Sequence, residues 1–151
     1  MKQNTMLEQA KGEKLEMNLL FYATVTNGPG KRLQKVIKGL VPRNMRTENY
    51  RTINSLTHRL RRPTHDLAVA VLFAASKQDL LDILSVRDLL EDLRIVLLIP
   101  NRQKDTIAKG HTLRPRFLTY ADSDFSDVAA VLRKMLENIY NNKMSGKKKR
   151  N

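Results

Sequence analysis

The sequence predicts an α/β fold in which helices cover both faces of a parallel sheet. Two short stretches, Asp66–Ala75 ("DLAVAVLFAA") and Arg94–Pro100 ("RIVLLIP"), are apolar almost throughout, as in strands that are buried on both faces. Five strand-like segments alternate with five helix-like segments, and this alternation favours parallel pairing through right-handed crossovers. The 151 residues suffice for one such domain. We expect it at residues 14–142, between a flexible N-terminal arm (1–13) and a basic, disordered tail (143–151).

The first half of the chain supplies two strands and two helices before the buried strand at Asp66–Ala75. Leu15–Val25 is predicted as a central strand, and the turn residues Asn27–Gly30 follow it. Apolar residues then recur at helical spacing from Leu33 to Leu40, which predicts the first helix. Arg46–Ile53 fits a half-exposed strand, and the helix after it has candidate caps at Asn54 or Ser55.

The second half repeats the alternation. Ser76 is the candidate cap of a leucine-rich helix that we expect to break near Ser85, with its acids on the solvent face. After the strand at Arg94–Pro100 come a weak helix ending at Gly110, a short strand ("RFLTY") and a last helix ending near Tyr140. The whole order predicts a flavodoxin-like, doubly wound five-stranded parallel sheet with strand order 2-1-3-4-5.

Ligands of doubly wound sheets bind outside the carboxyl ends of the strands, at the switch between strands 1 and 3. The loop Thr24–Lys31 ("TVTNGPGK") lies at that switch. A nucleotide-binding P-loop would need glycine at Val25 and a hydroxyl residue at Arg32, so this pattern fails at two fixed positions. A dinucleotide fingerprint fails as well, because Leu33 stands where its third glycine belongs.

Three interpretations of the loop stay open. Its start, Thr24-Val25-Thr26, resembles the first loop of flavodoxins, so a flavin or nucleotide-phosphate binding protein is one alternative. The free amides of a helix N-terminus, with Gly28, Gly30 and Lys31, would also form a generic anion site. In the third interpretation the two glycines serve only the turn into the first helix.

The later strands resemble those of another family, the receiver domain of bacterial response regulators. The segments "THDLAVAVLFAASKQDLLDIL", "RIVLLIP" and "RPRFLTYADSDFSDVAAVLRKML" have the order of its third, fourth and fifth strands with their helices. The resemblance covers Leu15–Tyr140. It implies a phosphoryl group on an aspartate after strand 3 and Mg²⁺ held by acids after strand 1. It further implies a serine or threonine after strand 4 and a lysine after strand 5.

This chain departs from the receiver pattern at each of those positions. No acid occurs between Met17 and Thr47 or from Leu67 through Gln78. The positions of this degenerate receiver pocket are occupied by Thr26, Asn27, Ala74, Ala75, Pro100, Tyr120 and Ala121. We therefore interpret the chain as a pseudo-receiver, a non-enzymatic signalling module that binds protein without being phosphorylated. The resemblance implies the surface of helix 4, strand 5 and helix 5, Arg102–Tyr140, as the face for a protein partner or a homodimer.

The formal net charge is +13, and the charge is unevenly distributed. Residues 31–62 hold ten bases against one acid, whereas residues 66–92 hold two bases against six acids. We expect a basic patch across the edge made by strand 2, formed by Lys35, Lys38, Arg59, Arg61 and Arg62. Such a patch is either a solvated surface or a site of weak, sequence-independent polyanion binding, because few aromatic residues accompany it.

Several other classes are excluded or disfavoured by composition. The chain has no cysteine, and its three histidines share no ligand spacing, so we expect no zinc site and no other metal site. We expect no cofactor. The apolar runs are too short for membrane insertion, and we expect a cytoplasmic protein.

Overall fold

The computed structural model of the protein describes residues 17–25 and 27–150, with side chains as far as Asn142. Its strands are β1 (Asn18–Ala23), β2 (Arg46–Tyr50), β3 (Leu67–Phe73), β4 (Ile95–Ile99) and β5 (Phe117–Tyr120). Its helices are α2 (Gly28–Leu40), α3 (Ile53–Leu60), α4 (Lys77–Ser85), a 3-10 turn η1 (Arg87–Leu89), α5 (Lys104–His111) and α6 (Ser126–Arg150).

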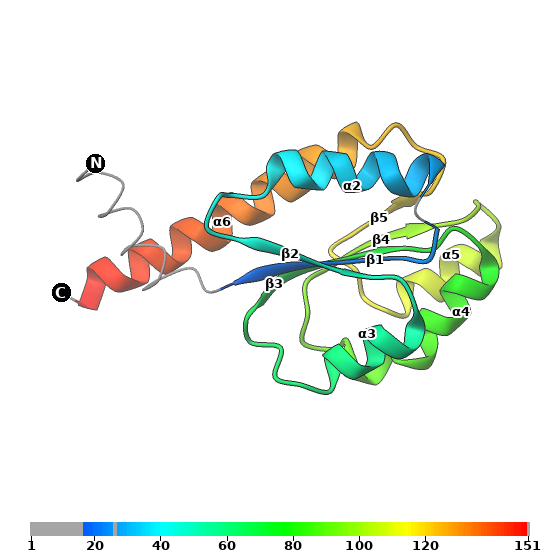
Figure 1. The fold of residues 1–151 in the computed structure, drawn as a ribbon, viewed down its shortest axis with the longest axis horizontal. Helices are drawn as coiled ribbons and strands as arrows, with labels where there is room; N and C mark the ends of the chain where they lie inside the picture. The colour runs from blue at the N-terminus through cyan, green and yellow to red at the C-terminus, as the bar shows by residue number, and fades with distance from the viewer. Residues whose placement is uncertain (1–16, 26, 151) are drawn as a thin grey trace.

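The five strands form one parallel sheet in the order β2-β1-β3-β4-β5 (Figure 1). The predicted flavodoxin-like α/β fold is therefore confirmed, strand order included. The switch in strand order falls between β1 and β3, so the loops after these two strands diverge to opposite faces of the sheet.

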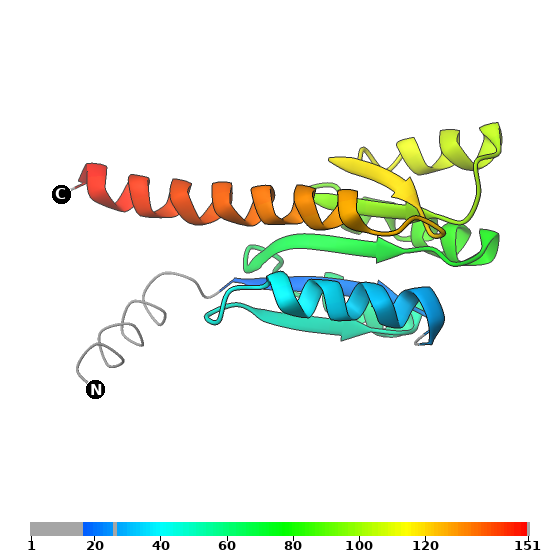
Figure 2. The same ribbon diagram turned by 90° about the horizontal axis from the view of Figure 1, so that it is seen from above.

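Helices cover both faces of the sheet, and each face has its own apolar core. Helices α2 and α6 lie on one face, whereas α3, α4 and α5 lie on the other (Figures 1 and 2). Alternate residues of β1 contribute to the two cores: Leu19 and Phe21 pack with α2 and α6, and Leu20 and Tyr22 pack with the opposite helices. Every residue of β3 is buried, because this strand is central in the sheet and covered on both faces.

The helix boundaries follow local capping chemistry. The predicted cap at Ser76 is confirmed, since its side chain accepts a hydrogen bond from the amide of Asp79. The predicted break near Ser85 is also confirmed, because α4 ends there and η1 follows. The cap predicted for α3 at Asn54 or Ser55 is wrong: Thr52 is the N-cap, and its hydroxyl accepts from the amide of Ser55.

The C-terminal part of helix α6 extends well past the ends of the strands (Figure 2). The sequence predicts a disordered tail from Lys143, whereas the structure continues the helix as far as Arg150. Lysine and arginine are good helix formers, and adding residues to an existing helix avoids the cost of nucleation. No helix in the described part of the chain, α6 included, is both long enough and apolar enough to cross a membrane.

Candidate functional site

The candidate site is the edge of the sheet where the parallel strands have their carboxyl ends. Thr24 follows β1, Ala74 and Ala75 follow β3, Pro100 follows β4, and Ala121 follows Tyr120 at the end of β5. The backbone joins neighbouring ends, since Ala74 N–H donates to Leu98 and Ala121 N–H to Ile99. Asn27 is the exposed N-cap of α2 and makes no side-chain capping bond. Thr26 lies outside the described residues.

One carboxylate, Asp79, reaches this edge from the first turn of α4. Its Oδ2 atom accepts a hydrogen bond of 2.8 Å from the Thr24 hydroxyl, after β1, and one of 3.2 Å from the Ala75 amide, after β3. The residue is buried, so the interpretation of Asp79 as part of the solvent face of α4 is wrong. Because both donors converge on the same oxygen, Asp79 ties α4 to the two strands that flank the switch point.

The sequence holds a signal for this inward carboxylate. Ser76 and Asp79 have the spacing of a capping box, in which the acid in the third helical position turns back toward the residues before the helix. Here the acid turns back one residue further, to Ala75, and so reaches Thr24 as well.

Tyr22, on β1, packs in the core on the α4 side of the sheet and is fully buried. Burial, together with the negative charges of Asp79 and Asp82, raises the pKa of its phenol to about 12. Among the residues that the structure describes, the hydroxyl has no hydrogen-bond partner. A phenol with this pKa stays neutral at physiological pH.

The loop after β1 uses its two glycines for its own turn. Gly28 has φ +57°, a left-handed conformation that favours glycine. A Cβ atom on Gly30 would lie 2.3 Å from the carbonyl oxygen of Val25, so the backbone of α2 packs directly on the loop. Lys31 is exposed beside them. The geometry gives both glycines a structural role in the turn, without requiring a bound anion.

The structure divides the predicted basic patch between two places. Lys35 and Lys38 are exposed on α2, whereas Arg61 and Arg62 are exposed after α3, which lies on the opposite face of the sheet (Figure 1). Arg59 is only 3% exposed, so its assignment to a surface patch is wrong. The helices after β1 and β2 cover opposite faces, and this is why their bases do not form one surface.

Arg59 is instead the buried centre of an ionic cluster whose two acids are partly exposed. Its Nε donates to Glu48 on β2 at 2.7 Å and its Nη2 to Asp66 at 2.8 Å. Glu48 also accepts from Asn18 Nδ2 and from the Tyr50 hydroxyl. Burial alone would raise the pKa of Glu48, but the hydrogen bonds from Arg59, Asn18 and Tyr50 outweigh it and lower this pKa.

The edge strand β5 carries an exposed cation beside an aromatic ring. The guanidinium of Arg102 lies 4.1 Å from the centre of the Tyr120 ring and forms an ion pair of 3.0 Å with Asp122. The hydrogen bond from Arg102 lowers the pKa of the Asp122 carboxyl. Arg102 therefore lies against Tyr120 at the β5 edge, within the predicted partner face.

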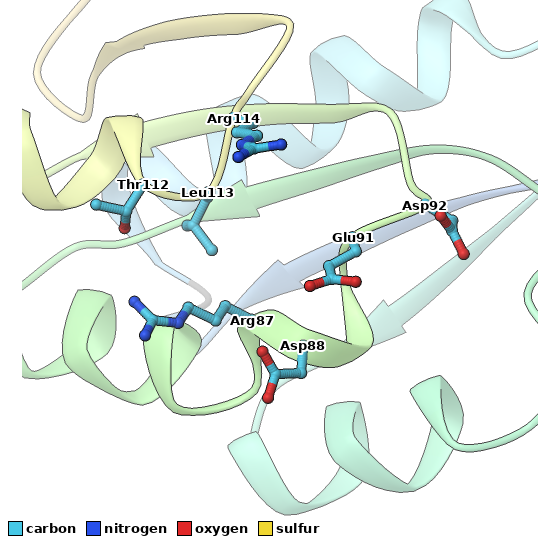
Figure 3. A pocket seen from close by; sticks show the side chains of 7 residues that line it. All are labelled: Arg87, Asp88, Glu91, Asp92, Thr112, Leu113 and Arg114. Atoms are coloured by element: carbon cyan, nitrogen blue, oxygen red, sulfur yellow. The ribbon is translucent and has the colours of Figure 1, made fainter.

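A hollow of about 420 Å³ lies at the other end of the sheet, before β4 and β5 (Figure 3). Its lining is mostly charged and consists of Arg87, Asp88, Glu91, Asp92, Thr112, Leu113 and Arg114. Ligands of doubly wound sheets bind at the opposite, carboxyl edge. No three histidine or acidic side chains in the described part of the chain are grouped as a metal site. We therefore assign no ligand to this hollow.

The chain matches no protein-family model and no curated protein.

Proposed function

We propose that the chain is a receiver-like signalling module without enzymatic activity, which acts by binding another protein and needs no phosphorylation. The proposal rests on the carboxylates found at the carboxyl ends of the strands and on their hydrogen bonds. A receiver collects several carboxylates there to hold Mg²⁺ and accept a phosphoryl group. At this edge one oxygen of Asp79 already accepts two hydrogen bonds, and Asp122, after β5, is paired with Arg102.

The Thr24–Asp79 hydrogen bond supports a module with one fixed state. In a switching receiver, phosphorylation moves a hydroxyl residue and reshapes the distant face. In this chain the Thr24 hydroxyl and the Asp79 side chain already join the loop after β1 to α4, without a phosphoryl group. A domain held in this way presents the same surface whether or not phosphate donors are present.

The expected partner surface is the face formed by α5, β5 and α6. Within residues 17–25 and 27–150, β5 pairs with β4 alone and is an edge strand of the sheet. Phe117 and Tyr120 are half-buried there, and Arg102 covers the Tyr120 ring. Partly exposed aromatic rings and arginines are enriched at protein interfaces, and this chemistry favours a protein partner or a second copy of the chain.

The first experiment tests phosphorylation. Wild-type protein and Asp79→Asn are incubated with acetyl phosphate or beryllofluoride and Mg²⁺, and mass spectra and NMR spectra are recorded. We expect no change in either protein, because the described part of the chain contains no cluster of carboxylates that could hold the ion. A stoichiometric phospho-aspartate in the wild type would contradict the proposal, and its loss in Asp79→Asn would identify the acceptor.

The second experiment tests the partner face. Arg102→Glu on the β5 side and Arg46→Glu on the opposite sheet edge make the same charge change at exposed positions. We expect Arg102→Glu to weaken self-association or partner capture and Arg46→Glu to leave both unchanged. Equal effects of the two variants would show that net charge, not this face, governs binding.

A flavin absorption band, or a rise in melting temperature with FMN, would favour the flavodoxin alternative at Thr24–Lys31.

A further inference from the structure

The two faces of the sheet differ strongly in the charge of their helices. Helix α2 carries four bases and no acid, and α6 carries seven bases and two acids, so the two helices have a net charge of +9, of which +5 belongs to residues 143–150 at the end of α6. On the opposite face α3, α4, η1 and α5 together carry five bases and four acids, a net charge of +1. The topology therefore concentrates positive charge on one face, which we call the α2/α6 face.

Helices α2 and α6 form one continuous layer, although most of the sequence separates them. They pack side by side over the core that contains Leu33, Ile37 and Leu132 (Figure 2). The guanidinium of Arg32 lies 5.4 Å from the centre of the Phe125 ring, just before α6, and so joins the two helices. The bases of this layer are therefore neighbours in space.

The cations of this layer are free to meet a ligand. Those with described side chains are all exposed: Lys31, Arg32, Lys35, Lys38, Arg133 and Lys134. Within the described side chains, none of the six is in an ion pair. Along the last part of α6 the sequence adds Lys143, Lys147, Lys148, Lys149 and Arg150. The bases of α6 thus lie at Arg133 and Lys134 and again along its last part, and Asp127 and Glu137 are the acids of the helix.

The dimensions of this surface suit a long polyanion. The 25 residues of α6 span roughly 37 Å at a rise of about 1.5 Å per residue. A nucleic-acid duplex carries about one negative charge per 1.7 Å of its axis, so a segment of that length presents roughly twenty phosphates. The six exposed bases of α2 and α6, with the further bases in the sequence of the last part of α6, can contact several of them at once.

The side chains between the cations decide which polyanion fits. Large apolar residues exposed in the described part are Val25, Leu81 and Tyr140, and only Tyr140 belongs to the α2/α6 face. Membrane-surface helices insert a row of large apolar side chains, and single-strand binders stack bases on several aromatic rings. Interfaces with acidic proteins also depend on buried aromatic or aliphatic anchors. A surface with charge and almost no apolar anchor matches the backbone of a duplex.

We propose that the α2/α6 face is a docking surface for the phosphate backbone of duplex nucleic acid, bound without regard to base sequence. This inference does not rest on the receiver-like function. With about six phosphate contacts, affinity falls by about three orders of magnitude between roughly 50 and 200 mM salt, because each contact releases condensed counterions.

The test compares two double variants of equal charge. Lys35→Gln/Lys38→Gln removes two exposed bases from the α2/α6 face, and Lys77→Gln/Lys104→Gln removes two exposed bases from the opposite face. Binding to a fluorescent DNA duplex is followed by anisotropy over a range of salt concentrations. An RNA duplex, a duplex of unrelated sequence and vesicles with anionic lipid serve as further probes.

We expect the first variant to lower the slope of log affinity against log salt by about 2, and to weaken binding at least about tenfold at low salt. The second variant should bind like the wild type, and the two DNA sequences should bind equally. DNA and RNA duplexes both satisfy the proposal, and their ratio shows which form is preferred. Equal loss in the two variants, no duplex binding at about 50 mM salt, or binding of vesicles alone would overturn it.

Discussion

At the scale of single residues, Arg59 is the cation on which three segments of the chain converge. It donates to Glu48 on β2, to Asp66 before β3 and to the carbonyl of Pro63. Its side chain is only 3% exposed, so its charge depends on these acceptors rather than on water. Its acidic partners keep some contact with water, since the side chains of Glu48 and Asp66 are 19% and 36% exposed, so losing Arg59 costs more than losing a surface ion pair and less than losing a fully buried one.

Arg59→Gln should therefore lower the free energy of unfolding by about 2 kcal/mol, between the ranges for an exposed and a buried ion pair, because both acids are partly exposed and Glu48 keeps two other donors. Arg61→Gln is the matched control, since Arg61 is exposed on the next position and should change stability by at most about 0.5 kcal/mol. Urea unfolding followed by circular dichroism measures both. Similar losses in the two variants would refute the structural role of Arg59.

The same cluster predicts a pH dependence of stability. The pKa of Glu48 is lowered in the folded protein, so the unfolded state binds the proton more readily. The stabilisation is thus complete above the unfolded pKa, near 4.5, and is lost as the pH falls through the folded value.

We expect Glu48→Gln to lose less stability than the wild type when the pH is lowered from neutral into that acid range. Glu137→Gln, at an exposed position on α6, should retain the wild-type pH dependence. Urea midpoints at neutral and acid pH measure the difference. If Glu48→Gln and the wild type lost equal stability, Glu48 would not be the group responsible.

At the scale of elements, α2 contains glycines with opposite roles. A Cβ at Gly30 would meet the carbonyl oxygen of Val25 at 2.3 Å, whereas a Cβ at Gly39 would meet nothing within 4 Å. Gly30→Ala should therefore destabilise the protein by about 2 kcal/mol or more, because backbone must move to admit the methyl group.

Gly39→Ala should instead stabilise the protein by roughly 0.5 to 1 kcal/mol, because alanine loses less backbone entropy in a helix. Thermal and urea unfolding of the two variants measure both effects. A neutral Gly30→Ala would show that the loop after β1 adapts freely, and would reopen the possibility that it closes around a bound anion.

At the scale of the whole molecule, the last buried residue of α6 in the described side chains is Ile139, and the helix continues past the sheet. Deleting residues 147–151 removes four bases and leaves this core contact in place. We expect the deletion to weaken duplex binding and to leave the thermal unfolding temperature within a few degrees of the wild type. Unfolding of the truncated chain would mean that the end of α6 packs on something essential, and unchanged binding would exclude it from the docking surface.

The sequence by itself determined the elements and their order. Periodicity in α2, the apolar runs of β3 and β4, and the cap at Ser76 are local features, and local features decide where a strand or helix forms. Strand order followed from the alternation of these elements, because right-handed crossovers leave few topologies. The edge that carries the candidate site followed from that order.

Only the tertiary structure decided which side chains face inward and which surfaces become continuous. The sequence predicts Asp79 and Arg59 on the solvent faces of their helices, but both are buried. Asp79 accepts a hydrogen bond from Thr24, and Arg59 is paired with Glu48 and Asp66. The α2/α6 face likewise brings the bases of α2 beside those of α6, whereas the sequence predicts a patch that α2 shares with α3. The physical reason is the same in each case: these contacts join segments far apart in the chain and form only when the chain folds. The capping-box spacing of Ser76 and Asp79 signals that this acid turns back toward the start of its helix, but no local pattern names the partner that meets it.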